Sequence, residues 1–435
     1  DEQEFQMKPD IVIWLVRDTC RVVDNPALNL ATQIANERDA LVVPLACLEP
    51  RRWGDQQFGM PRTGSHWMRF RSESLQALRV DLIARGSCLW VSAEEPVYAL
   101  NRINPSVNVI KVVCDRPLAT EERLENARIE AEGYPVVTHD VDDLFRFEQL
   151  PFELDELPAT FSKFRKIVEK KPGLVPDPPV EMHELTPCME QPWLDPVEWI
   201  ETFDSQLSPR AEVETYGGEI QAQRHWTTYL DARALSHYKQ TRNAFCGPMQ
   251  SSHLSAWLAH GCLSARQIWS DTLAYEAREG ANESTYWLRF ELLWREYFRW
   301  YARVSDWTLF RRNGPNDKNV SGDQNSTRFA GWKTGHTNCD IVDAAMQELN
   351  ETGWMSNRAR QLVASHLIYE LNLDWRLGAA YFESQLIDFD VASNWGNWAY
   401  IAGVGPDPRG GRIFNLNDQA DRYDPDQSYR RRWLT

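Results

Sequence analysis

The spacing of apolar residues changes part-way along this chain, and that change constrains the fold more than any other feature. Between residues 10 and 138, short apolar runs alternate with segments of helical periodicity; the runs cover 10–16, 40–48, 87–92, 107–114 and 135–138. Continuous apolar runs of this length are typical of parallel strands buried on both faces. From about residue 217 onward, apolar residues recur at helical spacing instead. We therefore predict an α/β domain followed by an all-α domain.

The 435 residues divide into three predicted parts. Residues 1–144 are expected to form a Rossmann-like α/β domain with a five-stranded parallel sheet, residues 145–215 an extended linker, and residues 216–435 a helical domain. The linker prediction rests on seven prolines between residues 170 and 196. No G-x-G-x-x-G motif follows the first strand, which excludes a standard NAD-binding domain. The sheet alone assigns no function.

Charge and cysteine content narrow the class of protein. The formal net charge of −16 argues against a protein held to nucleic acid by overall attraction, although it allows a local basic groove. The eight cysteines show no CxxC pair, so we expect reduced thiols in a cytoplasmic, intracellular monomer without a metal site. No apolar run reaches ~18 residues and no signal peptide is visible, so no membrane association is expected.

Aromatic residues gather in the second half, where 15 of the 19 tryptophans follow residue 190. Three dense segments, 290–300, 353–361 and 388–400, place Arg, Asn, Asp or Glu beside Trp or Tyr in apolar surroundings. Charged groups at apolar faces need partners. Three such segments together suggest a common polar, planar ligand, whereas for any single residue a core aromatic or a solvated acid is the simpler interpretation.

Individual residues are candidates for binding such a ligand. Arg360 and Asp388 are a candidate buried bidentate pair, or a purely structural ion pair. Glu291 and Trp294 share a helix face and suit a hydrogen-bonded, stacked base; the alternative is a solvated Glu beside a core Trp. The hydroxyl-rich residues 251–255 precede a helix predicted from about residue 254, which indicates either a phosphate seat or a plain N-cap.

Several longer motifs resemble those of the cryptochrome/photolyase family. They are DNPAL at 24–28, YKQTRN at 238–243, STYW at 284–287, FELLWREYF at 290–298, GWMSNRARQ at 353–361, DWR at 374–376 and DFDVASNWGNWAY at 388–400. STYW, the Gln at 361 and RYDPD at 422–426 are similar to the DASH-type cryptochromes. The resemblance covers nearly the whole chain, more weakly before residue 139, and it makes residues 1–144 an antenna-type domain and residues 216–435 an FAD-binding catalytic domain.

The resemblance also implies roles for individual residues. The implied FAD-binding residues are Tyr238, Ser251, Ser252, His253, Leu254, Ser255, Arg295, Trp354, Asn357, Arg360, Asp388, Asp390 and Asn394. Asn394 is expected to face the reactive N5 edge of the flavin. The implied cavity for a flipped thymine dimer is lined by Glu291, Trp294, Asn357, Gln361 and Tyr400. Glu291 is expected to hydrogen-bond the dimer, and Trp294 to stack on it.

A tryptophan relay for reducing the flavin is part of the same resemblance. Trp398 and Trp375 match its inner two members, but the outer position falls on Gly322, so Trp332, Trp307 or a tyrosine must substitute if the relay operates. The family also often binds a folate antenna (methenyltetrahydrofolate) between its domains, near an acidic residue. The matching position here is Pro117, with Glu121 and Glu122 displaced, which weakens this expectation.

The function implied is blue-light-driven repair of cyclobutane pyrimidine dimers in single-stranded DNA, by electron transfer from reduced FAD. The alternative is a blue-light photoreceptor that uses the same flavin for signalling with little or no repair. A third interpretation, a helical scaffold without cofactor, requires a colourless protein. The flavin motifs are common to the first two functions, so they do not separate them. Glu291, Trp294 and Asn357 favour repair.

Overall fold

The computed structural model describes residues 8–48, 56–187, 189 and 207–434. Its N-terminal part contains a five-stranded parallel sheet in the order β5-β2-β1-β6-β7. The strands are β1 (Asp10–Val16), β2 (Leu41–Cys47), β5 (Trp90–Ser92), β6 (Asn108–Asp115) and β7 (Val136–His139). The central strand β1 is buried on both faces, and its alternate residues enter two separate apolar cores. The predicted α/β fold is confirmed.

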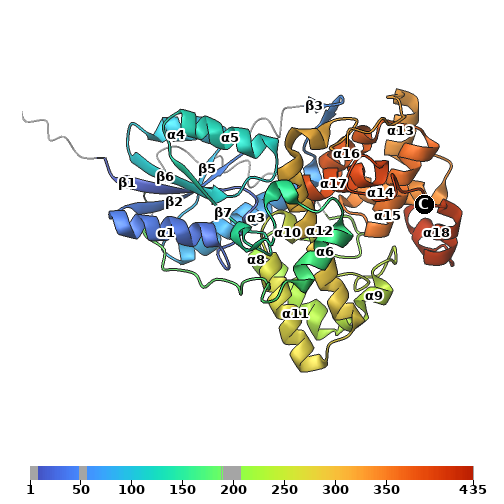
Figure 1. Ribbon diagram of the computed structural model, residues 1–435, viewed down its shortest axis with the longest axis horizontal. Coiled ribbons are helices and arrows are strands. Elements are labelled where there is room, and N and C mark those ends of the chain that lie inside the picture. The colour runs from blue at the N-terminus through green and yellow to red at the C-terminus, as the bar shows by residue number, and fades with distance from the viewer. Residues whose placement is uncertain (1–7, 49–55, 188, 190–206, 435) are drawn as a thin grey trace, which may run out of the picture.

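Helices cover both faces of this sheet (Figure 1). Helix α1 (Pro26–Arg38) lies on one face, and α4 (Pro96–Ile103) and α5 (Thr120–Ala131) lie on the other. Helix α3 (Ser65–Ala84) contacts α8 and α16 of the helical half. A short antiparallel pair, β3 (Gln56–Gln57) and β4 (Met60–Pro61), was not expected from the sequence, and it also contacts α16 through β4.

The C-terminal part is helical, as predicted. Its helices are α8 (Glu219–Asp231), α9 (Tyr238–Thr241), α10 (Ser255–Ala259), α11 (Ala265–Glu279), α12 (Glu283–Ser305), α13 (Ser326–Thr334), α14 (Asp340–Thr352), α15 (Asn357–Ser365), α16 (Trp375–Gln385), α17 (Val391–Ala402), α18 (Leu416–Tyr423) and α19 (Ser428–Trp433). Short 3₁₀ turns occur at η3 (Ala234–His237) and η4 (Asp306–Phe310). A π-helical turn, η5 (His366–Glu370), follows α15 directly.

The connection between the two halves is only partly extended. It contains two 3₁₀ turns, η1 (Phe147–Gln149) and η2 (Leu154–Glu156), and the helix α6 (Phe161–Lys170). Helix α6 buries Phe161, Phe164 and Val168 against the core. After it, residues 174–187 form neither helix nor strand, and the Val180 backbone N–H donates to Asp24 Oδ1 at 2.8 Å. Residues 188 and 190–206 of the predicted linker lie outside the described residues.

Buried acids that follow β7 tie the two halves together. Asp142 accepts from Arg21 of the α/β half at 2.5 Å, and both residues are buried. Asp143 binds Arg299 Nε at 2.7 Å and Arg303 Nη2 at 2.8 Å, both on α12. These two guanidinium groups hold the pKa of Asp143 well below its ordinary value, although burial acts in the opposite direction. Asp142 is therefore compensated within the α/β half, and Asp143 is compensated by two arginines of the helical half.

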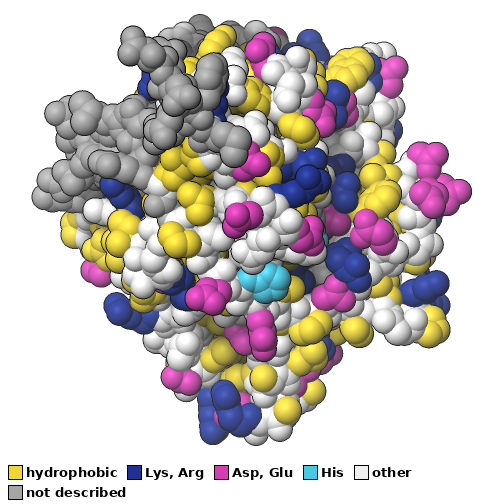
Figure 2. Space-filling view, turned by 90° about the vertical axis from the view of Figure 1, so that its left-hand side faces the viewer, with side chains coloured by type: hydrophobic (Ala, Val, Ile, Leu, Met, Phe, Trp, Pro, Cys, Tyr) yellow, Lys and Arg dark blue, Asp and Glu magenta, His cyan; other side chains and the backbone are white. Residues whose placement is uncertain are grey.

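Two surface features bear on the class of protein. On the face at the α/β end of the molecule, acidic and basic side chains are interspersed rather than gathered by sign (Figure 2). Among the described helices, none combines the length and the apolar character needed to cross a bilayer. The prediction that all cysteines are reduced is wrong for Cys88, which is disulfide-bonded. The free described cysteines are Cys20, Cys47, Cys114, Cys246, Cys262 and Cys339, and Cys188 lies outside the described residues.

Candidate functional site

Two adjoining cavities of about 260 and 400 Å³ lie within the helical half. The first brings together Tyr238, Ser251, Ser252, His253, Leu254, Ser255, Trp354, Asn357, Arg360, Asp388, Asp390, Asn394 and Trp398. The second adds Trp294, Arg295 and Tyr400, and both cavities reach Glu291, Asn357 and Gln361. Trp375 lines neither of the two. The volume of the second cavity is typical of ligand sites, and that of the first lies just below the usual range of about 300 Å³ or more.

A bidentate ion pair crosses the first cavity between α15 and the start of α17. Arg360 Nη1 and Nη2 donate to the two carboxylate oxygens of Asp388 at 3.1 and 2.7 Å, while its Nε donates to the Met355 carbonyl at 2.8 Å. The Asp388 side chain is 1% exposed and that of Arg360 is 25% exposed. The predicted pairing is therefore present. The exposed part of the guanidinium faces the cavity, where it can meet a polar ligand.

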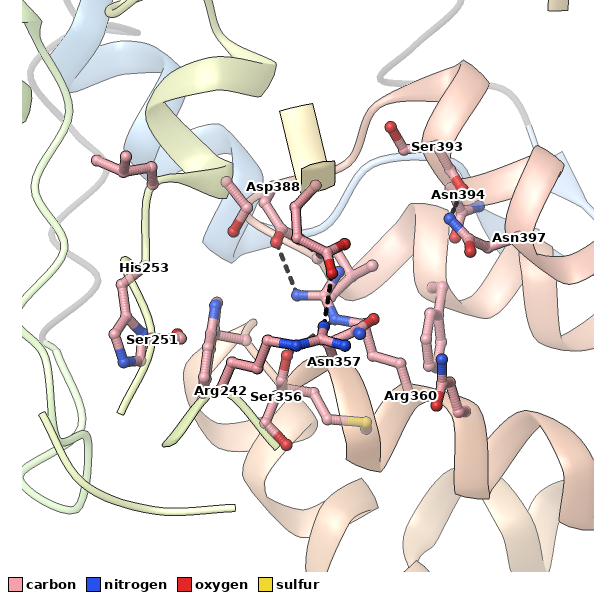
Figure 3. Close-up of a pocket in the computed structure, with 18 of the residues that line it drawn as sticks. Arg242, Ser251, His253, Ser356, Asn357, Arg360, Asp388, Ser393, Asn394 and Asn397 are labelled. Carbon is pink, nitrogen blue, oxygen red and sulfur yellow. Dashed lines mark hydrogen bonds and ion pairs between the residues drawn. The ribbon is translucent and has the colours of Figure 1, made fainter. Parts of the chain in front are cut away.

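Helix α17 presents amide and hydroxyl groups on the opposite wall (Figure 3). Asp390 caps the helix by accepting from the Ser393 backbone N–H at 2.6 Å. Asn394 donates its side-chain amide to the Ala379 carbonyl at 3.0 Å, and no hydrogen bond from the described residues engages its side-chain oxygen, which can accept from a ligand. A Cβ at Gly396 would lie 2.5 Å from the Phe298 ring, so glycine permits α17 to approach α12 this closely.

The hydroxyl-rich residues 251–255 lie across the cavity from α17, with Arg360 and Asp388 between them (Figure 3). The helix that follows, α10, has only five residues, so its contribution to a phosphate seat is smaller than expected from the sequence. His253 packs on Trp354 with ring centroids 4.5 Å apart. Burial lowers the pKa of His253 to about 3, so this ring is neutral at physiological pH.

Glu291 occupies the boundary between the two cavities. Its Oε1 accepts from Arg242 Nη1 at 2.6 Å and from the indole N–H of Trp287 at 3.2 Å. Its Oε2 accepts no hydrogen bond from the described residues and remains for a ligand. Burial raises the pKa of Glu291, and the charge of Arg242 opposes that rise. Sequence reasoning missed Arg242, although it lies within the YKQTRN motif.

The aromatic wall of the second cavity differs from the expectation in one respect. Trp294 is stacked on Phe161 of α6, with ring centroids 3.8 Å apart and 15° between planes. Phe298 is also stacked on the Trp294 ring, with centroids 5.5 Å apart and 26° between planes, so the two phenylalanines reduce the ring surface left for a base. Tyr400 accepts a short hydrogen bond from Arg412, whose guanidinium lies 5.0 Å over the ring. Phe161 was not singled out from the sequence.

Comparison with known proteins bears directly on this arrangement. The family model described as DNA photolyase matches residues 11–183, and that described as the FAD binding domain of DNA photolyase matches residues 287–435. The cryptochrome DASH of Idiomarina loihiensis is 42% identical over 423 residues, which cover 97% of this chain and 92% of the relative. The chain belongs to the cryptochrome/photolyase family.

Further members of the cryptochrome/photolyase family agree. The cryptochrome DASH of Xenopus laevis is 37% identical over 98% of this chain and 82% of its own length. The crystal structure of a Synechocystis cryptochrome matches with a TM-score of 0.92 and 35% identity, covering 99% of this chain and 89% of that one. A bacterial class III photolyase from Agrobacterium tumefaciens matches with a TM-score of 0.81 and 25% identity, covering 100% and 88%. The resemblance read from the motifs is confirmed.

The helical half of this cryptochrome/photolyase is thus an FAD-binding domain, as predicted. The first cavity fits that cofactor, because it combines hydroxyl groups on one wall, an acceptor oxygen on Asn394 and a guanidinium on Arg360. A flavin offers phosphates, ribityl hydroxyls and ring N–H groups to match such a set. The role of each lining residue toward FAD stays a prediction.

Beside Glu121 and Glu122, where the sequence places a folate antenna between the two halves, described side chains fill part of the space. Arg62, which follows β4, donates to both oxygens of Glu121 at 2.7 and 3.0 Å and to Glu383 Oε1 at 2.9 and 3.1 Å. The cavity beside it, which Glu122 also lines, measures about 40 Å³. Ligand pockets are typically about 300 Å³ or more. A folate fits here only if Arg62 moves aside.

Proposed function

We propose that this protein uses blue light and reduced FAD to split cyclobutane pyrimidine dimers in single-stranded DNA. The carrying observation is the second cavity, which adjoins the flavin cavity and turns Glu291, Trp294, Asn357, Gln361 and Tyr400 toward one space of about 400 Å³. When bound and reduced, FAD supplies the light-driven electron. The protein residues position the dimer beside it and exclude competing reactions.

Glu291 would hydrogen-bond the dimer through Oε2, the oxygen without a partner among the described residues. Arg242 and Trp287 hold Oε1 and thereby fix the direction of the carboxylate. Because the pKa of Glu291 is raised, its carboxyl group would share a proton more readily with a dimer carbonyl that gains negative charge. Gln361, which accepts from Arg358 at 3.1 Å, is oriented with its amide nitrogen available to the same cavity.

Single-stranded DNA is supported by the surface around the cavity. Cations lie over aromatic rings here: Arg358 is 5.1 Å over Tyr423, Arg412 is 5.0 Å over Tyr400, and Arg242 is 5.3 Å over Trp287. Alternating cations and aromatic rings are typical of single-strand grooves. Phe161 covers one face of Trp294, so the cavity offers less stacking to offset the cost of flipping a dimer out of a duplex.

The deciding experiment is a repair assay on oligo(dT) that carries one thymine dimer, with the flavin chemically reduced beforehand. We expect blue light to restore thymine in the single strand, more slowly in the duplex, and not at all in the dark. A Glu291→Gln variant with an unchanged flavin spectrum is the matched control, and it should repair more slowly. A full complement of reduced FAD with no repair of either substrate would overturn the proposal and favour a photoreceptor.

A further inference from the structure

The loop around Gly322 leaves no room for an aromatic electron donor. The φ angle of Gly322 is +114°, and a Cβ there would lie 2.6 Å from the carbonyl oxygen of Leu373. A side chain at this position is therefore strained and sterically blocked. Trp375 lies two residues after Leu373. Its ring centroid is 5.8 Å from that of Trp395, and its indole N–H donates to the Arg312 carbonyl at 2.9 Å.

A different set of rings extends outward from the flavin cavity. Trp398 lines that cavity, and its ring meets Trp332 of α13 edge-on, with centroids 6.2 Å apart. Trp332 is fully buried and in turn meets Tyr381 of α16, with centroids 5.8 Å apart. Both distances lie within the range of direct aromatic contact. Tyr381 is half-buried, so the three rings connect the cavity to the protein surface.

The surroundings of Tyr381 suit a donor that releases a proton with its electron. Its hydroxyl donates to Asn350 Oδ1 at 2.6 Å, and burial raises its pKa to about 12, so the phenol is neutral at rest. The Lys333 ammonium lies 5.9 Å over the ring and opposes any positive charge there. An amide oxygen is too weak a base to keep the phenolic proton, which therefore passes to solvent.

We propose that photoreduction of the bound flavin runs through Trp398, Trp332 and Tyr381, with Tyr381 as the terminal donor. Trp398 gives one electron to the light-excited oxidised flavin, and Trp332 then refills Trp398. Tyr381 refills Trp332 and loses its phenolic proton, which leaves a neutral tyrosyl radical. An external thiol restores the phenol by giving one hydrogen atom and becomes a thiyl radical. The proposal rests on bound FAD but not on DNA repair.

Exposed Trp307 is the competing terminal donor. It is 56% exposed and carries Arg311 at 4.9 Å over its ring. Within the described part of the chain, no ring contact joins Trp307 to Trp375 or to Trp398. A Trp307→Phe variant is therefore the matched control, because it removes an indole of similar size from outside the three-ring chain.

The test measures photoreduction of oxidised flavin under blue light with a thiol and without DNA. We expect Trp332→Phe and Tyr381→Phe to slow it at least ten-fold at full FAD content, and Trp307→Phe to leave it unchanged. Time-resolved spectroscopy should detect a neutral tyrosyl radical in the unaltered protein and a tryptophan radical in Tyr381→Phe, a signature that a merely structural role would not produce.

Three outcomes would overturn the route: unchanged photoreduction in Tyr381→Phe, no tyrosyl radical in the unaltered protein, or slowing in Trp307→Phe alone. If Trp332→Phe fails to fold, Tyr381→Phe still decides, because its ring keeps the same shape. Repair with chemically reduced flavin should be the same in Tyr381→Phe as in the unaltered protein. Loss of repair in the unaltered protein under those conditions would count against the proposed function and leave the electron route standing.

Discussion

Two glutamates in this molecule have the same kinds of partner but opposite surroundings. Glu291 binds Arg242 and the indole of Trp287 at the edge of a cavity of about 400 Å³. Glu383 binds Arg62 and accepts from the indole of Trp395 at 2.9 Å, beside a cavity of about 40 Å³. Around Glu291 one carboxylate oxygen is left for a ligand, whereas around Glu383 the protein occupies both oxygens. The residue types alone do not distinguish a binding site from an internal contact.

The ion pairs formed by Arg360 and by Arg62 also differ in their surroundings. Arg360 holds Asp388 beside the flavin cavity, where the carboxylate side chain is 1% exposed. Arg62 holds Glu121 between the two halves, where the carboxylate side chain is 51% exposed. A buried pair is expensive to break because the remaining charge is uncompensated, and an exposed pair contributes little. Burial therefore separates the two pairs as clearly as free space separates the two glutamates.

The largest expected effect is on Asp388→Ala compared with Glu121→Ala. We expect Asp388→Ala to lower the free energy of unfolding by about 3–5 kcal/mol and to release FAD, because Arg360 loses its buried partner. Glu121→Ala should cost less than about 1 kcal/mol, since Arg62 keeps Glu383. Denaturant unfolding and the flavin absorbance of the purified proteins measure both. Equal losses would show that burial does not separate these pairs.

The second-largest expected effect is the change in repair rate when Glu291 or Glu383 is replaced by glutamine. Glu291→Gln removes a charged acceptor at the cavity proposed for the dimer, which corresponds to about 1.5–3 kcal/mol, or roughly ten-fold or more in rate. Glu383→Gln should repair like the unaltered protein, because its carboxylate faces Arg62 and Trp395 instead. Single-turnover repair after one light flash compares the two variants. A loss in Glu383→Gln at full FAD content would contradict this assignment.

A smaller expected effect is on the way protein stability changes with pH. Burial raises the pKa of both Glu291 and Glu383, so the folded protein binds their protons more tightly than the unfolded chain does. This contribution to stability is fully present below the unfolded pKa of about 4.3 and is lost as pH rises through the raised folded value. Glu383→Gln should flatten the fall of Tm with rising pH more than Glu291→Gln, because the Glu383 side chain is 5% exposed and that of Glu291 is 28% exposed.

The smallest expected effect is a gain of ligand between the two halves. The double variant Arg62→Ala with Glu383→Gln opens the space filled by the guanidinium without leaving a buried charge unpaired. After incubation with methenyltetrahydrofolate and desalting, it should retain more folate absorbance per FAD than the unaltered protein. Equal retention would show that Arg62 does not close this space in solution.

Much of the fold was predictable because it follows from local patterns. The run at Asp10–Val16 was predicted as a strand with the observed bounds, since it is apolar throughout and is buried on both faces. The bounds of helix α13 do not follow from the sequence, because its first residues are polar and follow an irregular loop. The hairpin β3–β4 was missed, since two-residue strands carry no periodicity.

The site was predictable where its residues lie in recognised motifs and not where a segment outside those motifs takes part. Arg360 and Asp388 could be paired from the sequence because a buried arginine needs a carboxylate. The stack of Phe161 on Trp294 could not, since Phe161 belongs to a segment that the composition marks only as a connection. The closure by Arg62 was equally hidden, because it depends on where the unforeseen hairpin places that side chain.

The buried acids that follow β7 restrict how this protein can be recombined with its relatives. Arg299 and Arg303 of α12 find their carboxylate on Asp143, and Arg266 of α11 donates to the Asp143 carbonyl at 3.0 Å. A chimera joined anywhere between residue 143 and α11 combines arginines from one parent with acids from the other. Crossover points that keep residues 140–143 together with the flavin-holding half preserve the pairs of Asp143 with Arg299 and Arg303, and inheriting Arg21 from the same parent also preserves its pair with Asp142.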